Sequence, residues 1–313
     1  MTVRRLFAIV MTLLVMVGSR AASAQGTIAG EKTLNLVYIA WTGEAPLFPD
    51  GRAAGAKAIS WINETWQKAS YGKTWTKGHG WGPYFVPKRT VSTADALSRL
   101  LGEVRALAVE RGDAWTSEAG AITGWVTPRI QMHSAACCGG FVVNSGAKME
   151  HEYGHAIGFP HARALSSVGT TTTIIGYGPF DVMGQGGYGI NVQMRKRAGW
   201  VDVPGTPSTR TVTATGRYSL ESANNVEPRG PIGLTLCDNT YFVELRQERL
   251  LVYRNLGADA WALQDLDPTA KTDWELDVDQ TYALPTCTEA VTAVRKTKTD
   301  AVVTVQDTAE AKR

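Results

Sequence analysis

The sequence predicts an α+β protein in which a part that mixes strands and helices precedes a part built of strands alone. Within residues 34–111, an extended apolar segment is followed by two segments whose apolar residues recur at helical spacing. Past residue 204, the chain changes to short β-rich runs separated by turn residues, at intervals typical of a β-sandwich. We therefore expect a first domain over residues 25–204 and a small sandwich-like domain over residues 205–313.

Residues 1–24 have the pattern of a secretory signal peptide. Arg4 and Arg5 precede an apolar run, and small residues lead up to Ala24. The apolar run is too short for a membrane span, and no later stretch approaches the necessary length. We therefore expect cleavage after Ala24 and a secreted protein, periplasmic or extracellular, with no transmembrane segment.

The first domain is expected to open with a strand and a helix. Leu34–Ala40 reads LNLVYIA and is apolar except for Asn35, which indicates a buried strand. Ala53–Ser70 carries Ile59, Ile62 and Trp66 on one face, which indicates an amphipathic helix.

Four further elements are expected before the middle of the chain. Thr93–Arg111 begins with a cap-like Ser-Thr-Ala-Asp sequence and repeats leucine and valine on one face, as a helix does. Three segments have the composition of strands: Trp81–Val86, Ala121–Thr127 and Gly140–Val143. The last of them leads into a segment that contains three histidines.

That segment reads HEYGHAIGFPH and places three histidines where one metal ion can bind all of them. His151 and His155 are four residues apart, so on a helix they lie on one face. Gly158 favours the left-handed conformation that ends a helix, so the chain can turn and bring His161 to the same ion. A fourth tetrahedral position would stay open, and Glu152 follows the first ligand, where its carboxylate can take a proton from water.

This spacing is H-E-x-x-H-x-x-G-x-x-H, and the chain resembles the metzincin zinc peptidases, in particular their gametolysin-like branch. The resemblance is strongest over residues 148–201 and extends more weakly to residues 34–87 and 241–247. It implies a zincin fold, in which a twisted mixed sheet and helices hold an active-site helix. It also implies one catalytic Zn²⁺ bound by the three histidines, with Glu152 as general base.

The resemblance assigns Met183, in the sequence DVMG, to the methionine turn beneath the metal. We expect residues 162–173 to form a long loop beside the cleft and residues 174–181 to return beneath the metal. Some metzincins place a tyrosine two residues after this methionine. Here Gln185 occupies that position, so the tyrosine's role is vacant unless Tyr177 or Tyr188 fills it.

The second domain is expected to contain seven strands and one carboxylate-rich stretch. The expected strands are Arg210–Thr215, Arg217–Leu220, Gly233–Cys237, Thr240–Arg246, Leu250–Val252, Ala290–Arg295 and Ala301–Gln306. The carboxylate-rich stretch contains Asp265, Asp267, Asp273, Asp277 and Asp279. It could bind Ca²⁺, but it lacks the spacing of an EF-hand, and a solvated loop is the favoured interpretation.

Four cysteines in an exported chain favour oxidation. We expect Cys237 to pair with Cys287, since both lie in the second domain. Cys137 and Cys138 are adjacent, and three alternatives stay open for them: a vicinal disulfide, free thiols, or a bond from one of them to a more distant cysteine. A zinc-binding role is disfavoured because three histidines and an open position already complete a catalytic site.

The charge balance argues against nucleic acid as a partner. The whole chain has 32 basic and 29 acidic residues, and removal of the signal peptide takes away three arginines, so 32 − 3 = 29 basic residues remain. No segment combines clustered Lys and Arg with aromatic residues suited to stacking on bases.

The sequence therefore predicts a secreted zinc-dependent endopeptidase that acts on a protein or peptide substrate. Two alternatives stay open: an exported binding or adhesion protein with a structural zinc site, and a zinc hydrolase that cleaves a non-peptide amide or ester. The cleavage preference and the oligomeric state are not encoded in these patterns.

Overall fold

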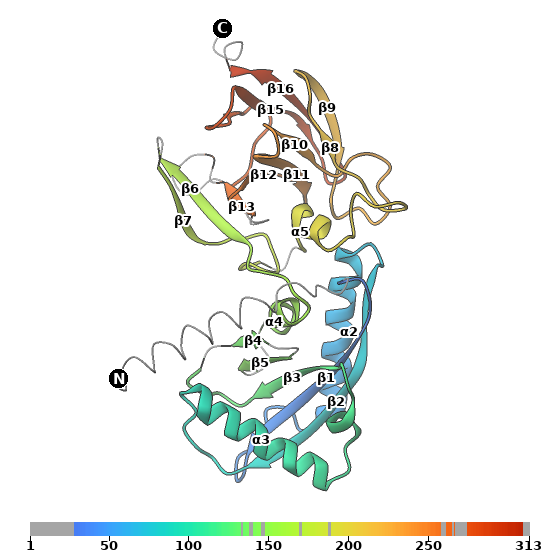
Figure 1. The fold of residues 1–313 in the computed structure, drawn as a ribbon, viewed down its shortest axis with the longest axis vertical. Coiled ribbons are helices and arrows are strands. Elements are labelled where there is room, and N and C mark those ends of the chain that lie inside the picture. The colour runs from blue at the N-terminus through green and yellow to red at the C-terminus, as the bar shows by residue number, and fades with distance from the viewer. Residues whose placement is uncertain are drawn as a thin grey trace, which may run out of the picture.

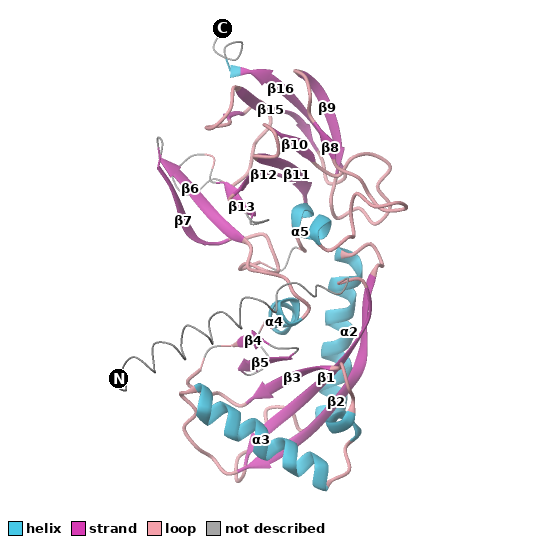
Figure 2. Ribbon diagram, in the orientation of Figure 1, coloured by secondary structure: helices cyan, strands magenta, loops and turns pink. Residues whose placement is uncertain are grey.

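The protein is a mixed α+β molecule with three sheets (Figures 1 and 2). The structure is a computed structural model that describes residues 28–132, 134–137, 140–144, 148–168, 171–186, 189–257, 261–264, 266 and 274–308. The predicted signal peptide, residues 1–24, lies outside the described residues. Among those described, no helix is both long and apolar enough to cross a membrane.

The first sheet has five strands in the order β2-β1-β3-β5-β4, and only β4 runs antiparallel to its neighbour. Its strands are β1 (Gly30–Trp41), β2 (Thr74–Val86), β3 (Ile122–Thr127), β4 (Ala135–Cys137) and β5 (Gly140–Asn144). The four strands expected in this part of the chain are confirmed, whereas β4 was not expected.

Helices cover both faces of this sheet, as Figure 2 shows. Alternate residues of β1 point to opposite faces, so Leu34 and Leu36 share a core with helix α2 (Gly51–Ala69), whereas Val37 packs with helix α3 (Ala94–Glu110). Burial on both sides explains why residues 34–41 of the strand are apolar except for Asn35. Both helices were predicted from their spacing, and a short 3-10 helix, Ala114–Ser117, follows α3.

The chain then enters helix α4 (Met149–Ala156) and, after a turn, the antiparallel strands β6 (Arg163–Val168) and β7 (Thr171–Tyr177). The expectation of a loop over residues 162–173 is therefore wrong. Strand β6 is held by parallel pairing with β13, almost one hundred residues further along the chain, and local sequence patterns cannot show such a contact.

Strands β6 and β7 belong to a seven-stranded sheet with the order β7-β6-β13-β12-β11-β10-β8. Its other strands are β8 (Arg210–Thr211), β10 (Leu234–Leu236), β11 (Tyr241–Arg246), β12 (Arg249–Asn255) and β13 (Trp261–Gln264). A four-stranded sheet, in the order β14-β15-β16-β9, contains β9 (Gly216–Glu221), β14 (Thr281–Ala283), β15 (Glu289–Lys296) and β16 (Asp300–Asp307).

The seven-stranded and four-stranded sheets share one apolar core. Val243 and Leu250 contribute to it from the seven-stranded sheet, and Leu220 and Val303 from the four-stranded sheet. All seven strands expected after residue 204 are present, and β13 and β14 were missed. The seven-stranded sheet also takes in β6 and β7 from before residue 204. The division into two domains at that residue stays a prediction.

Cys237 and Cys287 form a disulfide with their Cα atoms 6.0 Å apart. This is the pair that the sequence favours. Cys138 and the side chain of Cys137 lie outside the described residues, and so do Asp265, Asp267 and Asp273. The pairing of the adjacent cysteines and the Ca²⁺ site therefore stay predictions.

Candidate metal centre

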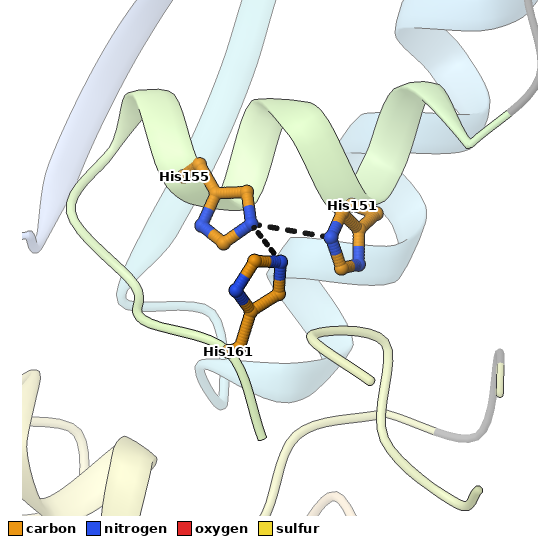
Figure 3. Close-up of side chains that lie close together, drawn as sticks. All are labelled: His151, His155 and His161. Carbon is orange, nitrogen blue, oxygen red and sulfur yellow. Dashed lines mark hydrogen bonds between the residues drawn. The ribbon is translucent and has the colours of Figure 1, made fainter. Parts of the chain in front are cut away.

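The three histidines of the HEYGHAIGFPH segment lie together with their Nε2 atoms directed at a common point (Figure 3). The Nε2 atom of His155 is 3.1 Å from that of His151 and 3.0 Å from that of His161. Helix α4 presents the first two from adjacent turns. The chain reverses at Gly158, whose φ of +107° is left-handed, and this reversal returns His161 to the other two.

Backbone carbonyls fix the orientation of two of the rings. Nδ1 of His151 donates a hydrogen bond to the carbonyl of Val182 at 2.7 Å, and Nδ1 of His155 donates to the carbonyl of Phe159 at 2.7 Å. A carbonyl oxygen only accepts, so each Nδ1 must carry the proton. In the neutral imidazoles, both Nε2 atoms then present lone pairs to each other.

Two lone pairs 3.1 Å apart repel unless a proton or a cation lies between them. Burial and the neighbouring histidines disfavour a proton, because they lower the pKa of His161 to about 4 and the pKa of His155 below its usual value. Tetrahedral zinc with Zn–N bonds of about 2.0–2.1 Å separates its ligand nitrogens by about 3.3 Å, close to the observed spacing. Neutral imidazoles with Nδ1 bound to carbonyls are therefore suited to a divalent transition metal.

Glu152 is buried on the same helix and lines the cleft beside His151 and His161. Burial raises the pKa of its carboxyl group to about 7, while the positive charge of Lys148 acts in the opposite direction. A carboxylate in this position can accept a proton near neutral pH.

The cleft that contains these groups has a volume of about 730 Å³, within the range of ligand-binding pockets. Its lining residues are Ser134, Asn144, Lys148, His151, Glu152, His161, Tyr177, Gly184 and Gln185. Tyr177 lies against His161, with the two ring centres 4.6 Å apart. The structure therefore brings Tyr177 to the site, whereas Tyr188 lies outside the described residues.

Met183 lies beneath helix α4 and is completely buried. A Cβ atom added to Gly154 would lie 2.3 Å from the Met183 sulfur and 2.7 Å from a ring carbon of Trp66. The helix can lie this close to the methionine only because Gly154 has no side chain. Met183 thus packs under the turn of the helix that joins the first two histidines.

The turn that carries Met183 is held by a buried carboxylate, that of Asp181. Its Oδ1 accepts the backbone N–H of Met183 at 2.8 Å, and its Oδ2 accepts the backbone N–H of Asn191 at 2.8 Å. The guanidinium of Arg246 lies 3.5 Å from Asp181 and donates to the carbonyl of Phe180 at 2.7 Å. Arg246 ends strand β11, so the seven-stranded sheet supports the turn.

Glu244 completes this buried network from the same strand. Its Oε1 accepts hydrogen bonds from Arg246, and its Oε2 accepts the backbone N–H of Val192 at 2.7 Å. The Arg246 guanidinium also donates to the hydroxyl of Tyr253. Burial alone would lower the pKa of Arg246, but Glu244 and its other partners outweigh it and raise that pKa, so the arginine stays charged.

No protein-family model matches this chain, and no curated protein matches it. Among solved structures, the crystal structure of wild-type OgpA from Akkermansia muciniphila is similar, with a TM-score of 0.33 and 13% sequence identity over 74% of each chain. A similarity this slight does not indicate a shared fold or function.

The structure brings together the three histidines and Glu152 that the sequence singles out, whereas the groups behind them were not predicted. The carbonyls of Val182 and Phe159 carry no signal in the sequence, because any residue can supply a carbonyl. Asn144, which lines the cleft, was also missed: its side-chain amide accepts the N–H of Ile130 at 3.1 Å and donates to the carbonyl of Ile130 at 3.3 Å. A helix-interior glycine at Gly154 was a usable sign of close packing.

Proposed function

We propose that this chain is a secreted zinc-dependent endopeptidase of the metzincin type. The observation that supports it most is the convergence of three imidazole Nε2 atoms beside a buried glutamate in an open cleft. Among the described His, Cys, Asp and Glu residues, no fourth donor joins His151, His155 and His161. An open position is typical of catalytic zinc sites, whereas structural sites are normally closed by a fourth protein ligand.

The chain's own residues would divide the work of hydrolysis. Zinc bound by the histidines would supply the Lewis acidity that activates water and polarises the scissile carbonyl. Glu152 would take the proton from the attacking water and deliver it to the leaving amine. The carbonyls of Val182 and Phe159 would keep the Nε2 atoms of His151 and His155 unprotonated and correctly directed.

Zinc suits this donor set better than Mg²⁺ or Ca²⁺. Three imidazole nitrogens are typical ligands of transition metals, whereas Mg²⁺ and Ca²⁺ prefer oxygen ligands. Secretion is proposed from the predicted signal peptide, and the Cys237–Cys287 disulfide is compatible with an oxidising compartment.

Glu152→Gln tests the role of the general base. We expect this variant to bind as much zinc as the unmutated protein and to lose roughly 100-fold to 10,000-fold in kcat on casein, because a neutral amide cannot accept the proton. Glu150→Gln is the matched control: Glu150 lies on the same helix but does not line the cleft, so activity should be retained. Near-normal hydrolysis by Glu152→Gln would contradict the proposed mechanism.

A further inference from the structure

Strand β7 forms one outer edge of the seven-stranded sheet. It pairs with β6 on one side, and no described strand pairs with it on the other. The outward-facing N–H and C=O groups of such an edge can accept another extended chain. Figure 1 shows β6 and β7 projecting from the body of the molecule, and Ile174, Ile175 and Tyr177 of β7 are exposed.

The composition of β7 favours pairing. The strand reads TTTIIGY and contains no charged residue and no proline, the two kinds of residue that most often protect exposed edges. Ile174 and Ile175 are 53% and 46% exposed. An interruption of the β6–β7 register leaves Ile175 as an extra residue in β7, and bulges of this kind are common beside active sites.

The edge leads directly to the candidate metal centre. Tyr177, the last residue of β7, lines the cleft and lies against His161. Seven residues of strand extend about 23 Å, at about 3.3 Å per residue. A polypeptide paired along β7 would therefore continue into the cleft that contains Glu152.

We propose that β7 binds an extended segment of the protein substrate as an additional strand, outside the residues that occupy the cleft. Main-chain hydrogen bonds would supply affinity, and Ile174 and Ile175 would contact apolar side chains of the substrate. The continuity of β7 with the cleft favours a substrate over a second copy of this chain as the occupant. This inference rests on the proposed peptidase function.

The test replaces both exposed isoleucines in the full chain. Ile174→Lys/Ile175→Lys places charges on the edge, as natural proteins do to prevent pairing. Val109→Lys is the matched control, because Val109 is an exposed β-branched residue on α3, which lies apart from β7 in Figure 1. Ile175→Ser is a milder second variant, which keeps the test valid if the double variant does not fold.

Two substrates separate binding along β7 from chemistry in the cleft: unfolded, carboxymethylated casein and a short quenched peptide that fills only the cleft. For the double variant we expect KM on casein to rise roughly tenfold and kcat/KM on the short peptide to stay within about twofold. The Val109→Lys control should match the unmutated protein on both substrates. Equal effects of the β7 substitutions on both substrates, or no effect on either, would overturn the proposal.

Two further measurements distinguish the remaining outcomes. Sedimentation would show a second copy as the occupant if the unmutated protein is a dimer and the double variant a monomer, and this too would overturn the proposal. The second measurement is the binding of labelled casein to the Glu152→Gln protein, with and without the β7 substitutions. If the unmutated protein cleaves neither substrate, the peptidase proposal fails, whereas weaker casein binding by the β7 variants would still support pairing along β7.

Discussion

At the scale of single residues, the candidate site depends on the lack of a side chain at Gly154 as much as on the three histidines. Met183 occupies the space that a Cβ atom on Gly154 would need. Gly154 lies between the first two histidines on helix α4, so any displacement of the helix there changes the separation of His151 and His155. The close contact therefore links packing beneath the helix to the geometry of the ligands.

Gly154→Ala should lower the free energy of unfolding by about 1–3 kcal/mol, because the added methyl group overlaps Met183 and Trp66. The matched control is Gly102→Ala on helix α3, where nothing lies within 4 Å of the added atom. That change should raise stability by about 0.5–1 kcal/mol, the ordinary gain from alanine over glycine in a helix. Urea unfolding of both variants measures the difference, and equal midpoints would contradict the packing account.

At the scale of elements, strand β11 supports the turn that orients His151. Arg246 and Glu244 hold the segment from Phe180 to Val192 through its backbone, and the carbonyl of Val182 in that segment accepts the Nδ1–H of His151. The support comes from a sheet to which none of the three histidines belongs. A substitution in β11 should therefore change zinc binding without altering His151, His155 or His161.

Arg246→Met tests this link. It leaves the buried carboxylates of Asp181 and Glu244 without their cationic partner, so we expect a loss of about 3–5 kcal/mol in the free energy of unfolding. It should also weaken zinc binding roughly 10-fold to 100-fold, the usual effect of losing support behind a ligand.

The control for that variant is Arg89→Met, in the segment that follows β2. Arg89 forms a partly exposed ion pair with Glu103, with 34% and 36% of the two side chains exposed, so its loss should cost less than about 1 kcal/mol and leave zinc affinity unchanged. Zinc titration and urea unfolding measure both variants. Unchanged zinc affinity in a folded Arg246→Met variant would show that the network is structural only.

At the scale of the whole molecule, local patterns predicted helices α2, α3 and α4 and most strands, but they did not predict contacts between distant segments. The spacing of His151, His155 and His161 is readable because a single helix and turn determine it. Strand β6 was missed because it is stabilised by β13, and its sequence RALSSV shows no regular alternation of apolar and polar residues. Arg246 was missed as a support of the turn for the same reason, since the two lie sixty-six residues apart along the chain.

The Cys237–Cys287 disulfide closes a loop of 50 residues in the second half of the chain. The loop-entropy relation gives it about 4 kcal/mol of stabilisation through the unfolded state. We therefore expect the Cys237→Ala/Cys287→Ala variant to unfold at lower urea concentration by an amount equivalent to about 2–4 kcal/mol. Zinc content at low urea should be unchanged, because neither cysteine lines the metal site. A stability equal to that of the unmutated protein would contradict this contribution.

The most direct test of the account is the zinc content of the purified full chain, measured by mass spectrometry beside a His161→Ala variant and a His79→Ala control. His79 lies on strand β2, away from the histidine cluster. We predict about one zinc per chain in the unmutated protein and the control, and clearly less in the His161→Ala variant, which has only two of the three ligands of an open catalytic site. Equal zinc in all three proteins, or none in the unmutated one, would contradict the central claim that these histidines hold the catalytic metal.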